Sequence, residues 1–116
     1  MPVRYALLVY NKPDAHEGMT DQQIQATVEE YAALRELPGF VDATRLKDVA
    51  TATTVCMTEG RMLVTDGPFA DTKAWFGGLF VLDADNLDIA LEIAARIPSV
   101  RLGGSIEVRP VWDDTP

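Results

Sequence analysis

The sequence of 116 residues contains only one cysteine and one histidine. Cys56 has no second cysteine with which to form a disulfide within the chain, and no cysteine or histidine spacing indicates a metal site. We therefore expect neither a metal ion nor another cofactor. A chain without disulfides is typical of a reducing compartment, and this predicts a cytoplasmic protein. Cys56 has no basic neighbour in sequence, which indicates a packed thiol and not a nucleophile.

Long hydrophobic runs and clusters of positive charge are also lacking. The apolar run Tyr5 to Tyr10 is too short for a signal-peptide core, and no stretch is long enough to cross a bilayer. Ten lysines and arginines face 18 acidic residues, for a net charge of −8, and the basic residues are scattered. Because nucleic acids and anionic membranes attract concentrated positive charge, we expect no direct binding to either.

The hydrophobic fraction of 47% is ordinary for a globular protein, and the length predicts one domain over residues 1–116. The pattern predicts strands over Val3–Asn11, Phe40–Leu46, Trp75–Asp83 and Ser105–Val111. It predicts a helix capped by Thr20 and ended by residues 37–39, and another that runs from Asp85 or Asn86 to about Ile97 and is ended by Pro98. An inserted hairpin, Thr53–Thr58 and Arg61–Thr65, turns at Glu59-Gly60.

Without the hairpin, the order is strand, helix, strand, strand, helix, strand. This order predicts an α+β protein of the ferredoxin-like type, βαββαβ, with two helices on one face of an antiparallel sheet.

Two central strands have apolar side chains on both faces, although an antiparallel sheet with one wet face should alternate with polar residues. The first strand places Tyr5, Leu7 and Val9 opposite Ala6, Leu8 and Tyr10; the third places Trp75, Leu79 and Val81 opposite Phe76, Phe80 and Leu82. Since two helices cover only one face, we expect a second copy of the chain to cover the other and form a homodimer. The alternative is that the hairpin or a terminal segment folds over that face.

Three separated motifs carry a resemblance to a known family: DGPFADTK at residues 66–73, Gly77-Gly78, and EVRPV at residues 107–111. In this order they resemble the DGPF group of YCII-related proteins, with the typical motif DGPFAETKE. The resemblance implies a ferredoxin-like fold whose sheets pair into a dimeric α/β barrel, and the neighbourhood of such genes implies a link to sigma-factor regulation. Asp71 and Ala74 depart from the family's two glutamates. The histidine–aspartate pair of the wider group is not evident, and His16, in a polar loop, is interpreted as solvated.

The signature loop holds the first candidate site residues. Asp66 is the best candidate for an acid/base group, although aspartate before Gly-Pro is also a common turn former. Lys73 is a candidate for binding an anion, or else forms a surface ion pair. Gly77 and Gly78 lie within a strand, where glycines often mark a bulge or the close approach of a ligand, or else pack tightly against a partner sheet.

The last strand offers a second group of candidates. Glu107 and Arg109 share one strand face, away from Ile106 and Val108, which should face the helices. The pair is either a structural ion pair at the dimer interface or the lining of an anion site anchored by Arg109. Tyr10 of the adjoining strand is the remaining candidate ligand-binding residue.

Three functions are compatible with these residues. The sequence favours binding of a small anionic molecule in a pocket at or near the dimer interface, in a regulatory role. The first alternative is a cofactor-independent isomerase, lyase or hydrolase that moves a proton on a small acid with Asp66. The second is a purely structural dimer without a pocket.

Overall fold

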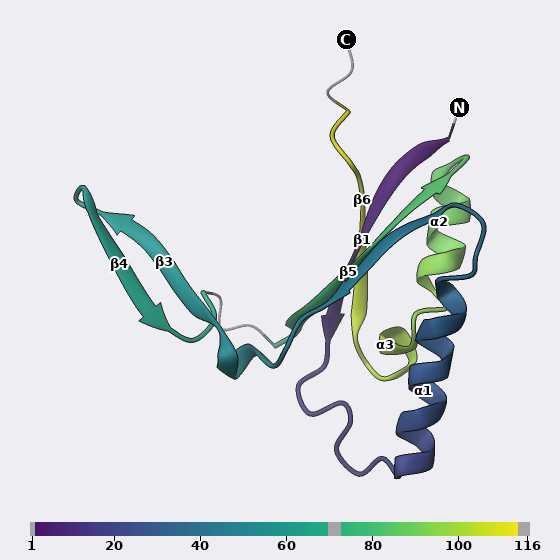
Figure 1. Ribbon diagram of the computed structural model, residues 1–116, viewed down its shortest axis with the longest axis horizontal. Coiled ribbons are helices and arrows are strands. Elements are labelled where there is room, and N and C mark those ends of the chain that lie inside the picture. Colours follow the sequence, from purple (N-terminus) through teal and green to yellow (C-terminus); the bar gives the residue numbers. More distant parts are fainter. Residues whose placement is uncertain (1, 70–72, 114–116) are drawn as a thin grey trace.

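The protein is described by a computed structural model that covers residues 2–69 and 73–113. An open antiparallel sheet has the strand order β2-β5-β1-β6. Its strands are β1 (Val3–Asn11), β2 (Phe40–Arg45), β5 (Trp75–Ala84) and β6 (Ser105–Pro110). The helices α1 (Asp21–Leu34), α2 (Leu87–Ala94) and α3 (Pro98–Arg101) lie on one side of it (Figure 1). The predicted α+β class and the order of strands and helices are confirmed, and this sheet is not a closed barrel.

The inserted segment follows β2. A 3₁₀ helix, η1 (Val49–Thr51), leads into the hairpin of β3 (Thr53–Thr58) and β4 (Arg61–Asp66), which form a separate two-stranded sheet. Among the described residues, no helix is long and apolar enough to span a membrane.

Helix ends follow from their capping residues. The Thr20 side chain accepts a hydrogen bond from the Gln23 backbone, and the Gln23 side chain accepts one from the Thr20 backbone, so the predicted capping box is confirmed. Asn86, and not Asp85, caps α2. The prediction that this helix runs to Ile97 was wrong, because it ends at Ala94 and Pro98 begins the short helix α3. Proline suits a first helical position, where its missing N–H has no intrahelical partner.

The core lies between the helices and the sheet face formed by alternate residues of β1. Tyr5, Leu7 and Val9 are buried there, as the alternation predicts, and Ile106 and Val108 of β6 pack against them. The other buried apolar residues come from α1, β5, α2 and the segment after α2: Leu34, Leu82, Ala84, Ala90, Ala94 and Ile97.

A bulge in β5 changes which face Phe76 occupies. Gly78 pairs with Val9, but the next residue of β1, Tyr10, pairs with Phe76, so Gly77 is the extra residue. Directly paired residues share a face, and the Tyr10 and Phe76 ring centroids are 5.4 Å apart. Placing Phe76 on the face of Phe80 was therefore wrong, because a bulge shifts the alternation by one residue.

The second face of the sheet is apolar at its centre and polar around it. Ala6 and Leu8 of β1 lie there beside Val81 and Leu79 of β5, their paired residues. The surrounding positions carry Arg4 and Asp83, which form an ion pair at 2.9 Å, and also Asp42, Thr44, Glu107 and Arg109. An apolar centre with a polar rim is the usual composition of a protein–protein interface.

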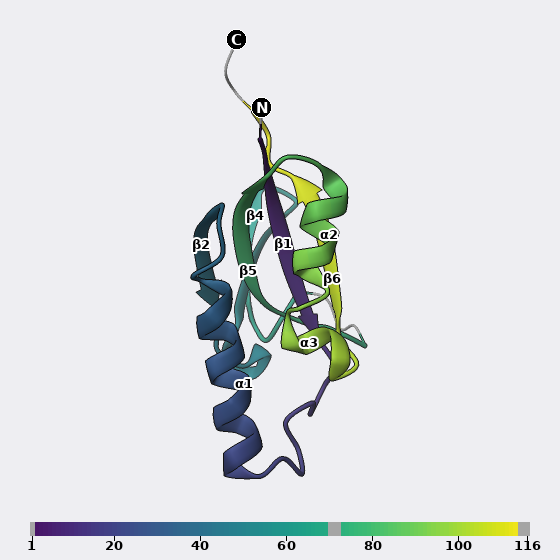
Figure 2. The ribbon, with the colours of Figure 1, turned by 90° about the vertical axis from the view of Figure 1, so that its right-hand side faces the viewer.

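The β3–β4 hairpin does not fold back over this face. Figure 1 shows it projecting on the side of the sheet opposite the helices, and Figure 2 shows the helices in front of the sheet and the hairpin behind. The radius of gyration is 16.4 Å, whereas a compact chain of this length has about 13 Å. Cys56 of β3 is exposed, so the expectation of a packed thiol was wrong. The hairpin stands away from the core that would have buried this side chain.

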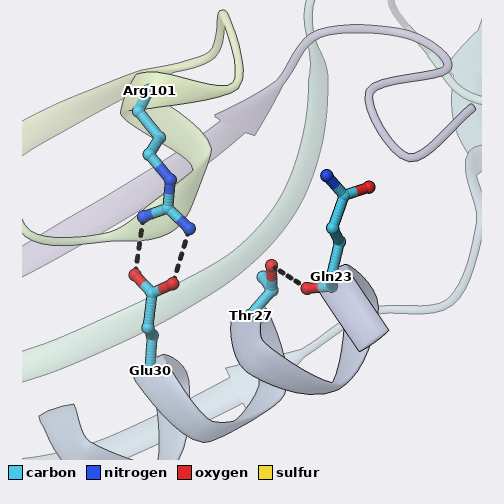
Figure 3. A network of polar contacts seen from close by, with 4 residues as sticks. All are labelled: Gln23, Thr27, Glu30 and Arg101. Carbon is cyan, nitrogen blue, oxygen red and sulfur yellow. Dashed lines mark hydrogen bonds and ion pairs between the residues drawn. The ribbon is translucent and has the colours of Figure 1, made fainter. Parts of the chain in front are cut away.

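An ion pair joins α1 to α3 and should make stability depend on pH. Arg101 donates two hydrogen bonds of 2.6 Å to the Glu30 carboxylate (Figure 3). Nearby in α1, the Thr27 hydroxyl donates a hydrogen bond to the Gln23 backbone carbonyl. The Arg101 hydrogen bonds hold the pKa of Glu30 below its ordinary value of 4.5. A carboxylate with a lowered folded-state pKa stabilises the protein above its unfolded pKa, and this stabilisation disappears as pH falls through the folded pKa.

We therefore expect Arg101→Gln to reduce the difference in urea unfolding midpoint between pH 6 and pH 3. Arg96→Gln is the control, because Arg96 takes part in neither ion pair found among the described residues. An Arg101→Gln protein with the same pH dependence as the wild type would show that the pair adds nothing to stability.

Candidate functional site

A pocket of about 410 Å³ lies between α1 and the β2–β5 edge of the sheet. Its size is within the range of small-molecule sites. Apolar side chains form much of the wall: Val9, Ile24, Val28, Ala43 and Phe80. The polar and charged side chains that line it are Asn11, His16, Thr27, Tyr31, Arg35 and Arg45. The pocket lining therefore suits a molecule that carries both apolar and polar groups.

The charged lining of this pocket has one sign. Arg35 and Arg45 carry it, and no aspartate or glutamate among the described residues lines the pocket, although acidic residues outnumber basic ones by 18 to 10 in the sequence. The two ion pairs among the described residues involve neither Arg35 nor Arg45. Arg35 lies over the Phe40 ring at 5.8 Å from the centroid, a cation–π contact that leaves its donors available. Such a lining attracts anions.

Three side chains form a hydrogen-bonded chain at one side of the pocket. Ser99 Oγ donates to Asn11 Oδ1 at 2.6 Å, and Tyr31 OH is 2.8 Å from Ser99 Oγ. Because the serine has one proton and gives it to Asn11, Tyr31 must be the donor to Ser99. Ser99 is only 3% exposed, so the chain fixes both pocket residues. The Asn11 amide nitrogen lies against Gly77, where a Cβ atom would collide with it.

A second, more open hollow of about 860 Å³ adjoins the first, and four residues line both: Asn11, His16, Arg45 and Gly77. The second hollow extends to η1 and to Trp75 and Phe76. His16 is exposed, as its loop position predicts, yet it stands where the two hollows meet. The sequence pattern predicted a solvated loop residue and did not predict that His16 would line a pocket.

A model of the YCII-related domain matches residues 3–114 of this chain. The chain belongs to the YCII-related family. A similar protein, an uncharacterised protein of Rhizobium meliloti (strain 1021), is 31% identical in an alignment of length 114 that covers 92% of this chain and 90% of the relative.

In this YCII-related protein the described residues of the signature loop (66–69 and 73 of the DGPFADTK motif) are not part of the pocket lining. Asp66 ends β4, where it pairs with Thr53, and it is exposed. Gly67 has a φ of 103°, donates its N–H to the Ala52 carbonyl and accepts a bond from Thr54 Oγ1. These hydrogen bonds hold together the end of the hairpin, which is a structural role typical of residues in a turn. Residues 70–72, and with them Asp71, lie outside the described residues, and Lys73 is exposed just before β5.

The structure does not gather the remaining predicted site residues in one place. Gly77 and Gly78 line the pocket. Tyr10 contacts Phe76 on the second face of the sheet. Glu107 and Arg109 lie on that face too, paired with Leu8 and Ala6, and Arg109 borders a shallow hollow with Trp112.

Sequence reasoning missed the pocket residues Asn11, Tyr31, Arg35 and Arg45, and it missed Ser99, which links Asn11 to Tyr31. Tyr31 and Ser99 are 68 positions apart, and Asn11 and Ser99 are 88 apart. No local motif links such positions. The only sequence signal is the polar Asn11 that ends an otherwise apolar strand.

Proposed function

We propose that this YCII-related protein binds a small molecule with an anionic group and an apolar body in the pocket between α1 and the β2–β5 edge. The carrying observation is the pocket's charge: two arginines line it without a carboxylate among the described lining residues, in a chain of net charge −8. Asp66 is exposed and is not part of this lining, so we favour binding over the acid/base alternative.

Arg45 is the proposed anchor of the anionic group. It lines both hollows beside Asn11 and His16, so it stands at the junction through which a ligand would enter the pocket. A guanidinium can donate two parallel hydrogen bonds to a carboxylate, which gives both affinity and orientation. The apolar body would lie against Phe80, which stacks on Tyr31 with ring centroids 6.0 Å apart.

Binding can be tested with benzoate and its neutral analogue benzamide, by isothermal titration and by amide NMR shifts. We expect benzoate to bind more tightly than benzamide and to shift signals of residues that line the pocket. Arg45→Gln should weaken benzoate binding about 10-fold or more, since a hydrogen bond to a charged group contributes about 1.5–3 kcal/mol.

The matched control for Arg45 is Arg96→Gln, because Arg96 is an exposed arginine that is not part of the pocket lining. It should leave benzoate affinity within about twofold, since a distant exposed charge is largely screened by salt. Equal affinity for benzoate and benzamide, or shifts confined to other parts of the chain, would refute the proposal.

We further propose that the chain is a DGPF-type member of its family with a ferredoxin-like fold, and that the second sheet face pairs with a second copy. The exposed area of 8660 Å² supports the pairing with a second copy, because a compact monomer of 12.7 kDa exposes about 6,200 Å². If each copy buried the excess of about 2,400 Å², the interface would have the size of a permanent dimer. Glu107 and Arg109 would then lie within that interface.

A further inference from the structure

One face of the β3–β4 hairpin carries apolar side chains that its own chain leaves exposed, with Thr53 and Asp66 at the end of that face. Val55 pairs with Val64, and Met57 pairs with Met62. Paired residues share a face, so these four side chains form one patch, the Val/Met face. Their exposed fractions are 62%, 55%, 67% and 67%. The opposite face carries Cys56 and Leu63 between threonines and Arg61.

An exposed hairpin of this kind needs support from outside itself. Two strands alone are marginally stable in water, and three or more strands or a packed layer are normally required. Within residues 2–69 and 73–113 the hairpin strands pair only with each other, in a sheet separate from the four-stranded sheet. Exposed apolar patches on soluble proteins mark interaction sites. The Val/Met face therefore has the character of an interaction surface.

The direction of the hairpin identifies the partner. It projects on the side of the four-stranded sheet that the helices leave uncovered, as Figures 1 and 2 agree. A copy of the chain seated on the uncovered face would lie on the same side as the hairpin. The area exposed in excess of a compact monomer, about 2,400 Å² per copy, is also in the range that a permanent dimer buries.

We propose that the hairpin is an arm whose Val/Met face packs against the second copy, so that each copy is held by its partner's arm. This rests on the dimer proposed above, and adds that the arm, beyond the paired sheets, supplies affinity. The occupant is a second copy and not an unrelated protein, because a symmetric pair covers the sheet faces and both arms at once.

The first test places two lysines on either face of the arm. Met57→Lys with Val64→Lys charges the Val/Met face, whereas Cys56→Lys with Thr65→Lys places the same charges one residue away on the opposite face. Sedimentation equilibrium should give twice 12.7 kDa for the wild type. We expect the first variant to raise the dimer dissociation constant about 100-fold or more, and the second to change it about threefold or less.

The outcomes separate the two proposals. A wild-type mass of one chain would overturn both the dimer and the arm. If both variants had the dimer dissociation constant of the wild type, the arm alone would be overturned. If both raised this constant by the same factor, the assignment of the Val/Met face would be overturned. Circular dichroism of each variant checks that the body remains folded.

A second measurement avoids charged substitutions. Met57→Cys in a Cys56→Ser background places the only thiol on the Val/Met face, and the wild type carries its only thiol on the other face. We expect iodoacetamide to modify Met57→Cys at least about tenfold more slowly than wild-type Cys56, because burial excludes the reagent. Dilution that dissociates the dimer should remove this difference. Equal rates at high concentration would overturn the inference.

Discussion

Leu7→Ala is expected to lower the free energy of unfolding by about 2–5 kcal/mol, the largest loss that we expect from a single substitution. Leu7 lies in the central strand β1, is 0% exposed, and belongs to the cluster between sheet and helices. Removing its side chain leaves a cavity that the sheet on one side and the helices on the other prevent from closing. Urea unfolding followed by far-UV circular dichroism, at fixed protein concentration, measures the change.

Leu91→Ala is the matched control for this core substitution. Leu91 lies in α2 and is 46% exposed, so the same atoms are removed from a site that is half in water. Alanine is also the better helix former, and we expect a loss below about 1 kcal/mol. Equal losses at both positions would show that Leu7 is not packed as described.

Gly78→Ala is expected to destabilise the protein by about 1–3 kcal/mol, although it adds only one methyl group. A Cβ atom at this position would lie 2.6 Å from the Thr44 carbonyl oxygen of β2. That oxygen belongs to the backbone of an adjacent strand, so β2 and β5 would have to separate. Because both strands border the pocket, the substitution should also weaken benzoate binding. Urea unfolding and titration measure the two effects.

Gly77→Ala is the control from the neighbouring residue. Its Cβ would meet the Asn11 side-chain amide, which can shift if it weakens its hydrogen bond from Ser99, and no backbone atom lies closer than 3.9 Å. We expect a stability loss clearly smaller than that of Gly78→Ala, with a change in pocket NMR signals as Asn11 moves. A larger loss for Gly77→Ala would contradict the packing described for this edge of the sheet.

Much of the local structure was predictable because the signals lie within a few residues. The capping-box pair Thr20 and Gln23 predicts the start of α1. Glu59-Gly60, between two runs rich in strand-forming residues, predicts the hairpin turn, where Glu59 has a φ of 52° and Gly60 one of 77°. Alternation in β1 correctly separated the buried Leu7 from Leu8 on the other face. These features depend on neighbouring side chains and backbone angles.

Other features depend on contacts between distant segments. The bulge at Gly77 reversed the face of Phe76, and α2 ended at Ala94, before the proline that was expected to stop it. Cys56 was expected to be packed, but nothing local in β3 shows that the hairpin leaves the body of the protein. Each error arose where the position of a segment, and not its local conformation, decided the outcome.

By itself, the sequence determined the α+β class, the order of strands and helices, the apolar character of both sheet faces and the motifs that resemble the family. Only the tertiary structure decided which polar and charged side chains come together at the pocket. The Tyr31–Ser99–Asn11 chain and the pocket beside Arg45 join segments up to 88 positions apart. The physical reason is that strand and helix propensities act over a few residues, whereas a pocket exists only after sheet and helices have packed.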